Sequence, residues 1–319
     1  MLLSPVPMHI PDGFLTPLVS AIGWLLAASS ITVAIRQTRR QLGERQIPLM
    51  GVLAAFIFAA QAINFPVAAG TSGHLLGGAL AAIVVGPWAA TLIMTAVIAV
   101  QGLVFQDGGL LVMGWNIVNM GVFTALTGYV CYRLARGLIG STSGASVAAA
   151  FVAAWISVEV GAIATSIELA ASGTSPLSLA LPAMAGVHAL IGLGEGLITS
   201  GAIGFLQASR PELLQAGEMA PGRRGAVAVV AGMVLALTVA TLSPLASSSP
   251  DGLEFVAGQH GFLGLGQSAT YSILPGYTIG IIHNPAMTTM VAVGIGTLIV
   301  FVAAWLVGRA TVGRRGIAD

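Results

Sequence analysis

The sequence has no lysine, a single cysteine and few charged residues, and each shortage excludes a class of protein. Charged residues make up 7% of the 319 residues, against about 25% in an ordinary soluble domain, which excludes a soluble fold. A phosphate-binding Walker A loop needs a lysine, so any ATP-driven step must be carried out by another polypeptide. The lone Cys131 cannot form an internal disulfide and is not a metal site by itself.

Long apolar runs recur along the whole chain, and hydrophobic residues make up 56% of it. Eight runs are long enough to span the hydrocarbon core of a bilayer, and a ninth run is shorter. We therefore predict an all-α, polytopic membrane protein surrounded by the lipid bilayer. The expected helices lie at 16–36, 48–68, 74–86 (the short one), 87–106, 110–134, 146–169, 184–207, 225–245 and 288–308.

Arginine indicates the orientation of these helices, because the cytoplasmic flanks of membrane proteins collect positive charge. With the N-terminus outside, all twelve arginines fall on the cytoplasmic side and the C-terminus lies inside. This agreement requires the short run at 74–86 to count as a crossing, so it favours nine spans over eight. The outer side then carries acidic residues and no arginine.

A polar stretch between the sixth long run and the seventh marks a boundary between two units. We predict a seven-helix unit over 1–217, a cytoplasmic linker over 218–224 and a unit with two helices over 225–319. Between the helices of the second unit lies an outer loop at 246–284, which is too polar and too rich in glycine, serine and proline to span. The role of this loop does not follow from its sequence.

The segment MHIPDGFL at 8–15 could be an ordinary outer loop or a chelating N-terminus. If the mature chain begins at Met8, its free α-amine, the amide nitrogen of His9 and Nδ1 of His9 can close a five- and a six-membered ring around one ion. Three nitrogens in a plane suit Ni²⁺, and Cu²⁺ or Co²⁺ less selectively. A peptide bond in front of Met8 would remove this ligand set.

His74 is the best candidate for a fourth ligand. It follows an irregular, glycine-containing loop, NFPVAAGTSGH at 64–74, and opens the short helix. Short membrane segments flanked by glycine are favoured places for ion sites, although a single histidine there can also be only a packed residue. Asn64 and Ser72 of the same loop are candidates to support the ligands or to line the path of the ion.

His188 and Glu195 share one face of a span, roughly 10 Å apart. Intramembrane carboxylates are costly and usually face a bundle interior or a watery cavity. The two residues could form an internal hydrogen-bonded pair, a proton relay or a second ion site, and the same alternatives hold for Glu159.

Three of these segments together resemble a known family. MHIPDGFL at 8–15, NFPVAAGTSGHLLGGALAAIVVGPW at 64–88 and HALIGLGEGLIT at 188–199 are similar to the CbiM/NikM substrate-binding components of energy-coupling factor (ECF) transporters. PDGLE at 250–254 resembles the PDGLE domain, a form of the small N component. The resemblance implies an S-component-like bundle fused to an N-type unit.

The resemblance also implies a site and partners. Carried onto matching positions, the family's near-square metal site consists of Met8, His9 and His74, although residues 1–7 precede the motif here. The chain would capture Ni²⁺ or Co²⁺ for import into a prokaryotic cell through the plasma membrane, without a prosthetic group. A transmembrane coupling (T/Q) protein and two ATPase (A/O) subunits would drive release, and no nucleic acid would take part. Displacement of the N-terminal segment from His74 would free the ion.

Two other classes of function stay open from the sequence. A self-sufficient metal-cation channel or secondary transporter would use His188, Glu195 and Glu159 as an intramembrane path. A membrane-embedded enzyme is less well supported, because no Ser/His/Asp arrangement, HExxH motif or paired-carboxylate signature is present. The planar nitrogen set favours nickel, but related proteins serve cobalt for cobalamin synthesis, and the residues do not separate the two ions.

We predict that the native chain starts at Met8, since a blocked amine would abolish the chelate. N-terminal sequencing of protein made in its own cells checks this, and a retained Met1 would contradict it.

Overall fold

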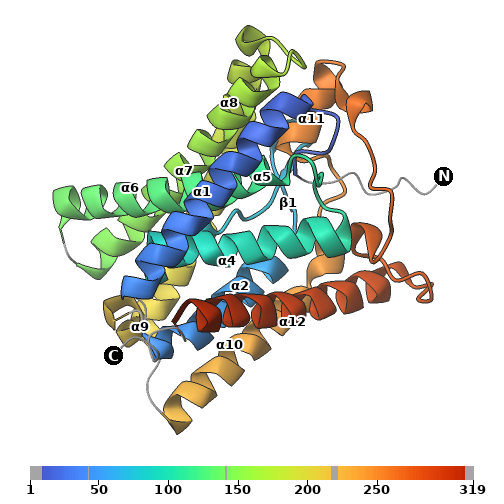
Figure 1. Ribbon diagram of the computed structural model, residues 1–319. Coiled ribbons are helices and arrows are strands. Elements are labelled where there is room, and N and C mark those ends of the chain that lie inside the picture. The colour runs from blue at the N-terminus through green and yellow to red at the C-terminus, as the bar shows by residue number, and fades with distance from the viewer. Residues whose placement is uncertain (1–8, 42, 141, 217–221, 313–319) are drawn as a thin grey trace.

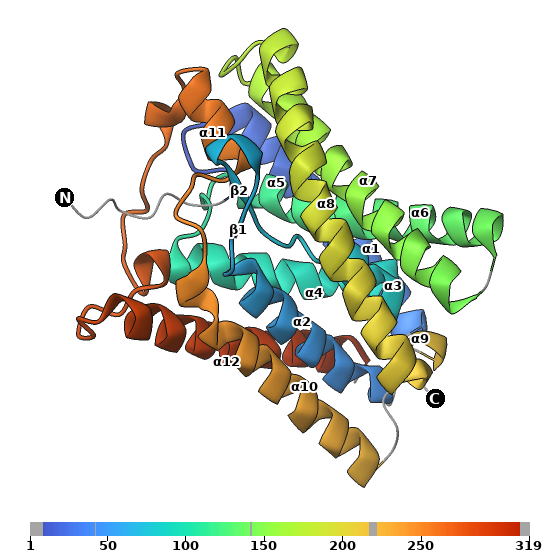
Figure 2. The same ribbon diagram turned by 180° about the vertical axis from the view of Figure 1, so that it is seen from behind.

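The computed structural model describes residues 9–41, 43–140, 142–216 and 222–312 and is built mostly of helices (Figures 1 and 2). The α-helices are α1 Pro17–Gln41, α2 Ile47–Gln61, α3 Gly78–Val85, α4 Pro87–Val100, α5 Met113–Ile117, α6 Thr124–Ile139, α7 Ser143–Ala171, α8 Leu177–Ser209, α9 Pro211–Ala216, α10 Arg223–Thr241, α11 Gly252–Gln259 and α12 Pro285–Val312. Two π-helical segments, η3 Gln101–Phe105 and η4 Val118–Phe123, extend α4 and join α5 to α6.

The remaining elements are short. The 3-10 turns are η1 Glu44–Gln46, η2 Ala68–Gly70, η5 Ser243–Leu245, η6 Leu263–Leu265 and η7 Pro275–Tyr277. The strands β1 Phe65–Pro66 and β2 Ser72–Gly73 pair antiparallel, with Phe65 opposite Gly73 and Pro66 opposite Ser72. This small hairpin is the irregular loop that the sequence predicts before the short helix.

Within the described residues, six helices are long and apolar enough to cross a membrane, which confirms the prediction of a helical, polytopic membrane protein. They are α1, α4 with η3, α7, α8, α10 and α12. The other three expected ranges also contain helix, but α2 has 15 residues, α3 has 8, and η4 interrupts the run from α5 to α6. The count of nine crossings stays a prediction.

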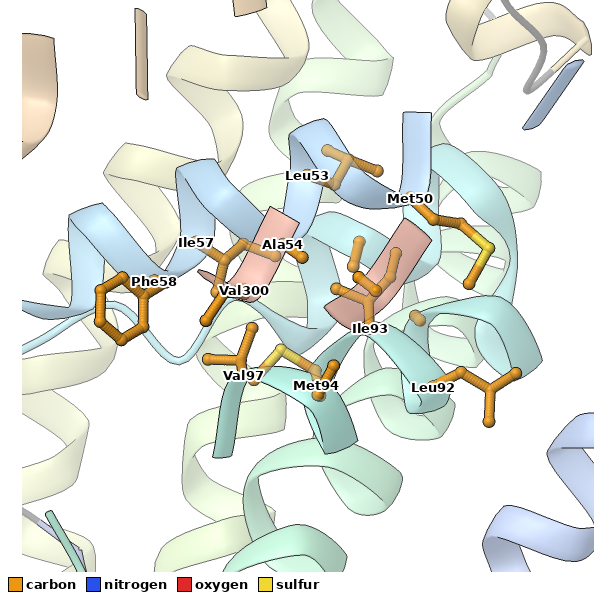
Figure 3. Packing of buried hydrophobic residues seen from close by; sticks show 14 of the residues in the cluster. Met50, Leu53, Ala54, Ile57, Phe58, Leu92, Ile93, Met94, Val97 and Val300 are labelled. Carbon is orange, nitrogen blue, oxygen red and sulfur yellow. The ribbon is translucent and has the colours of Figure 1, made fainter. Parts of the chain in front are cut away.

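The largest buried cluster lies where α2, α4 and α12 pack together, and α10 packs on α2 beside it. Figure 3 shows side chains of this cluster, among them Met50, Ile57 and Phe58 from α2, Ile93 and Val97 from α4, and Val300 from α12. The helices α10 and α12 of the expected second unit therefore share one core with the first unit. They do not stand apart as a separate hairpin.

The short helix α3 lies inside the bundle, against α4, α6, α7 and α8. Glycines set both of its ends: Gly77 has φ +82° and Gly86 has φ +83°, a region that side chains rarely adopt. Eight residues of helix rise only about 12 Å, far less than the roughly 30 Å of a bilayer core. The part of the loop directly in front of α3, residues 71–75, is buried in the protein, whereas Pro66, Ala68 and Gly70 are exposed.

Helix α1 approaches α5 at two glycines. A Cβ on Gly114 would lie 2.4 Å from the backbone nitrogen of Trp24, and a Cβ on Gly23 would lie 2.4 Å from the Trp115 ring. The contact fixes α1, and with it the residues just before α1, on the start of α5.

We expect Gly114→Ala to destabilise the protein by about 1–3 kcal/mol, because the added methyl meets backbone that cannot move aside as a side chain can. Thermal unfolding of the purified protein in detergent measures this. Gly137→Ala in α6 is the matched control, since its Cβ would meet nothing within 4 Å. Equal unfolding temperatures for the two variants would contradict the close contact.

Candidate metal centre

Hydrogen bonds from two side chains, Asp12 in the segment itself and Asn116 in α5, hold the segment 9–15 against the start of α5. The carboxylate of Asp12 accepts the backbone N–H groups of residues 110–112 at 2.9 to 3.3 Å. The side chain of Asn116 pairs with the backbone of Ile10, accepting its N–H and donating to its carbonyl at 3.1 Å each. These contacts place the preceding residue, His9, at a fixed point in the interior.

The loop that carries His74 is held from α8. The carboxylate of Glu195 accepts the backbone N–H groups of Leu76 at 2.6 Å and of Gly77 at 2.9 Å. Glu195 is fully buried, so these two bonds are not exchanged with water. Because they fall two and three residues after His74, they fix where its imidazole lies.

The structure brings the two predicted histidines together. The ring centroids of His9 and His74 lie 5.6 Å apart at an interplanar angle of 78°. Nδ1 of His74 lies 3.0 Å from the carbonyl oxygen of Leu75, a hydrogen bond when Nδ1 carries the proton, which leaves the lone pair on Nε2. Nε2 of His9 is buried and has no hydrogen-bond partner among the described residues.

The other edge of the His9 ring faces Asp107. Nδ1 of His9 lies 3.2 Å from the Asp107 carbonyl oxygen and 3.4 Å from its Oδ1. Met8, the remaining predicted ligand residue, lies outside the described residues. The structure therefore describes the two imidazoles of the predicted site but not the α-amine of Met8.

Both imidazoles line a pocket of about 80 Å³. A water molecule takes roughly 30 Å³ of liquid, so the pocket has room for an ion with one or two waters. Its wall also includes His188 from α8, Asn116 and the Asp251–Gly252 turn that starts α11. The described residues contain no group of three or more histidine, cysteine or acidic side chains arranged to hold a metal ion.

Burial favours the metal-binding form of His74, which lies in the non-helical segment ahead of α3. Loss of water, and then the neighbouring His9, lower the pKa of His74 to about 4. The imidazole is therefore neutral, with its lone pair available, throughout the neutral range. On the opposite wall, burial and then the Glu254 carboxylate raise the pKa of Asp251 well above its usual range.

His188 and Glu195 do not bond to each other. Nδ1 of His188 lies 2.7 Å from the carbonyl oxygen of Met184, one turn earlier on α8, while Glu195 bonds to the loop after His74. A separation of about two helix turns along one face leaves each side chain its own neighbours. The interpretation as an internal pair is wrong, and Glu195 instead supports the His74 loop.

Asn64 and Ser72 lie at a different contact. The hydroxyl of Ser72 donates to the carbonyl of Ser249 at 2.8 Å, and the carbonyl of Asn64 accepts the N–H of Ser247 at 2.8 Å. Neither residue lines the pocket. They attach the hairpin of the His74 loop to the chain that follows α10.

Sequence reasoning missed three residues that shape the site. From the sequence, Asp107 is only one of the acidic residues of the outer side, Asn116 is only a candidate for a polar contact between helices, and Tyr277 does not stand out. A carboxylate and an amide beside apolar helices were the available signals for the first two residues. Tyr277 gave no signal, because its partner Asp107 lies 170 positions away.

Two family models match the chain. The CbiM model, described as a cobalt uptake substrate-specific transmembrane region, matches residues 9–213. The PDGLE domain model matches residues 226–312. The first match contains both imidazoles of the pocket, and the second contains Asp251 and Tyr277.

Similar proteins are named as transport proteins for nickel or for cobalt. A putative fused nickel transport protein NikMN of Archaeoglobus fulgidus is 36% identical over 305 residues, which cover 95% of this chain and 98% of the relative. The cobalt transport protein CbiM of Sorangium cellulosum is 33% identical over 224 residues, 67% of this chain and 99% of the relative. The crystal structure of a truncated transition metal transporter, 30% identical, matches 63% of this chain and 99% of its own at a TM-score of 0.58.

We expect Glu195→Gln to lower stability by about 1–3 kcal/mol and to weaken metal binding, because an amide can accept only one of the two N–H groups and leaves the other buried without a partner. Thermal unfolding in detergent and calorimetric titration measure the two effects. Glu159→Gln in α7 is the control, since Oε1 of Glu159 is buried with no partner among the described residues. Equal effects of the two substitutions would contradict the role of Glu195.

Proposed function

We propose, from the premise that this chain belongs to the CbiM family of cobalt-uptake transmembrane proteins and carries a PDGLE domain, that it is the substrate-capture component of an ECF-type importer for Ni²⁺ or Co²⁺. The single observation that carries the proposal is the meeting of His9 and His74 at one buried pocket. The two residues are 65 positions apart and lie on separate elements. Nothing in ordinary packing requires two imidazoles to share a pocket this small.

The proposed ligands are four nitrogens: the amine of Met8, the amide and Nδ1 of His9, and one imidazole nitrogen of His74. Such a set approaches a square plane, which Ni²⁺ prefers and Co²⁺ accepts. In the structure the Nδ1 edge of His9 faces Asp107, so chelation requires a half-turn of the ring that exchanges its two edges.

Release of the ion follows from the attachment of the two histidines to different helices. His9 is fixed to α5 through Asp12 and Asn116, whereas His74 is fixed to α8 through Glu195. A small movement of α1 and α5 relative to α8 would part the ligands and break the chelate. A separate coupling protein and two ATPase subunits supply that movement, in keeping with the absence of lysine from the printed sequence.

The topology proposed for this function is nine crossings with the N-terminus outside and the C-terminus inside. Arginine placement supports it, and the count takes the short α3 as one of the crossings. The unit over 1–217 captures the ion, and the unit over 225–319 assists loading.

We expect chain beginning at Met8 to bind Ni²⁺ more tightly than Co²⁺ in calorimetric titration, with His9→Ala and His74→Ala each weakening Ni²⁺ binding at least 100-fold, because each removes part of a multidentate site. His283→Ala is the control, since His283 is exposed in the loop before α12. The same titration on chain that keeps residues 1–7 tests the amine. Unchanged affinity in His74→Ala would refute the site.

A further inference from the structure

The outer segment, residues 246–284 of the C-terminal unit, bonds to three other parts of the chain, and Figure 2 shows its helix α11 beside β1 and β2. Its backbone bonds to the His74 hairpin, with the N–H of Ser72 donating to Pro250 at 2.8 Å. It bonds to the N-terminal segment through the N–H of Gln267 and the carbonyl of Asp12, at 2.7 Å. It also bonds to η3, where the N–H of Leu274 donates to Val104 at 3.0 Å.

One side chain of the outer segment reaches the metal ligand through a single intermediate. The hydroxyl of Tyr277 donates to Oδ2 of Asp107 at 2.7 Å. Asp107 in turn places its Oδ1 3.4 Å and its carbonyl oxygen 3.2 Å from Nδ1 of His9. All three side chains are buried, so water does not compete for these contacts.

The backbone is strained at both ends of the Tyr277–Asp107 contact. Among the described residues, only Gln106 and Tyr277 have a positive φ without being glycine, at 53° and 59°. Gln106 immediately precedes Asp107. A bulky residue in this conformation is uncommon, and such strain persists where the surrounding structure enforces it, often at functional sites.

The ring and the hydroxyl of Tyr277 have separate roles. The ring stacks on Phe105, with centroids 4.6 Å apart and an interplanar angle of 15°. Burial, and then the Asp107 carboxylate, raise the pKa of Tyr277 well above its usual range, so the hydroxyl keeps the proton that it donates. Replacing Tyr277 by phenylalanine therefore keeps the ring packing and removes the hydrogen bond to Asp107, together with the longer one, 3.5 Å, that Nε2 of Gln101 donates to the hydroxyl.

We propose that Tyr277 is a positioning residue for metal capture. It fixes Asp107, which orients the His9 imidazole and accepts a hydrogen bond from the ring nitrogen that does not bind the metal. The inference rests on the proposed function of His9. When the ring turns so that Nδ1 binds the ion, its Nε2–H edge faces Asp107, which then holds the bound ring in place. Metal-ligating histidines generally donate their second nitrogen to such a partner. The C-terminal unit thereby prepares a ligand that belongs to the other unit.

The test is Tyr277→Phe in the full chain, titrated with Ni²⁺ in detergent. Loss of a hydrogen-bonded partner behind a ligand costs 10- to 100-fold in metal affinity, and we expect about 10-fold here because Asp107 itself remains. Tyr271→Phe is the matched control: Tyr271 lies on the same segment and donates to the carbonyl of Gly102 on η3 at 3.2 Å, not to Asp107. We expect its affinity to stay within twofold of the original.

A second measurement separates positioning from general loosening. The visible absorption of bound Ni²⁺ reports the ligand field, and we expect its band to shift in Tyr277→Phe and in Asp107→Asn but not in Tyr271→Phe. The double variant that combines Tyr277→Phe with Asp107→Asn should bind Ni²⁺ no more weakly than Asp107→Asn alone, because both substitutions interrupt the same contact from Tyr277 through Asp107 to His9. If Tyr277→Phe does not fold, the visible absorption band of Ni²⁺ bound to Asp107→Asn provides the test, and an unshifted band overturns the proposal.

The outcomes distinguish this inference from the function it rests on. If His9→Ala and His74→Ala leave Ni²⁺ binding unchanged, the proposed metal site is wrong, and Tyr277 and Asp107 have no metal ligand to position. If those two variants abolish binding while Tyr277→Phe stays within twofold, or falls together with Tyr271→Phe, the site stands and the positioning role is overturned.

Discussion

The carboxylate of Asp12, which accepts three successive backbone N–H groups at residues 110–112, is the interaction on which the arrangement of the site depends. It turns an extended stretch before α1 into a fixed arm that enters the protein. Together with the Asn116 bonds to Ile10, it defines where His9 lies relative to His74. The glycine contact between α1 and α5 continues this attachment into the helices, where small residues let two backbones approach.

A second constraint comes from the missing length of α3. A full span in this place would carry His74 to the outer surface, whereas a helix of 8 residues lets the loop ahead of it enter the bundle. The backbone groups freed by this break need partners, because lipid offers none. Glu195 provides two of them from α8, so a costly buried carboxylate is balanced by the N–H groups of a loop that carries a ligand.

The C-terminal unit is joined to the rest of the protein in two ways. Within the helical layer, α10 and α12 pack on α2 and share its core. Outside that layer, the outer segment bonds to the N-terminal arm, to the His74 hairpin and to η3. These attachments place the second unit in direct contact with the segments that carry His9 and His74.

The sequence by itself determined the membrane class, located the long apolar helices and singled out His9 and His74, because apolar runs and short motifs are local properties. The tertiary structure decided which polar groups meet. It separated His188 from Glu195, moved Asn64 and Ser72 to the hairpin contact, and joined Tyr277 to Asp107. Partners so far apart in the chain leave no periodic signal, since their distance depends on how all the helices between them pack.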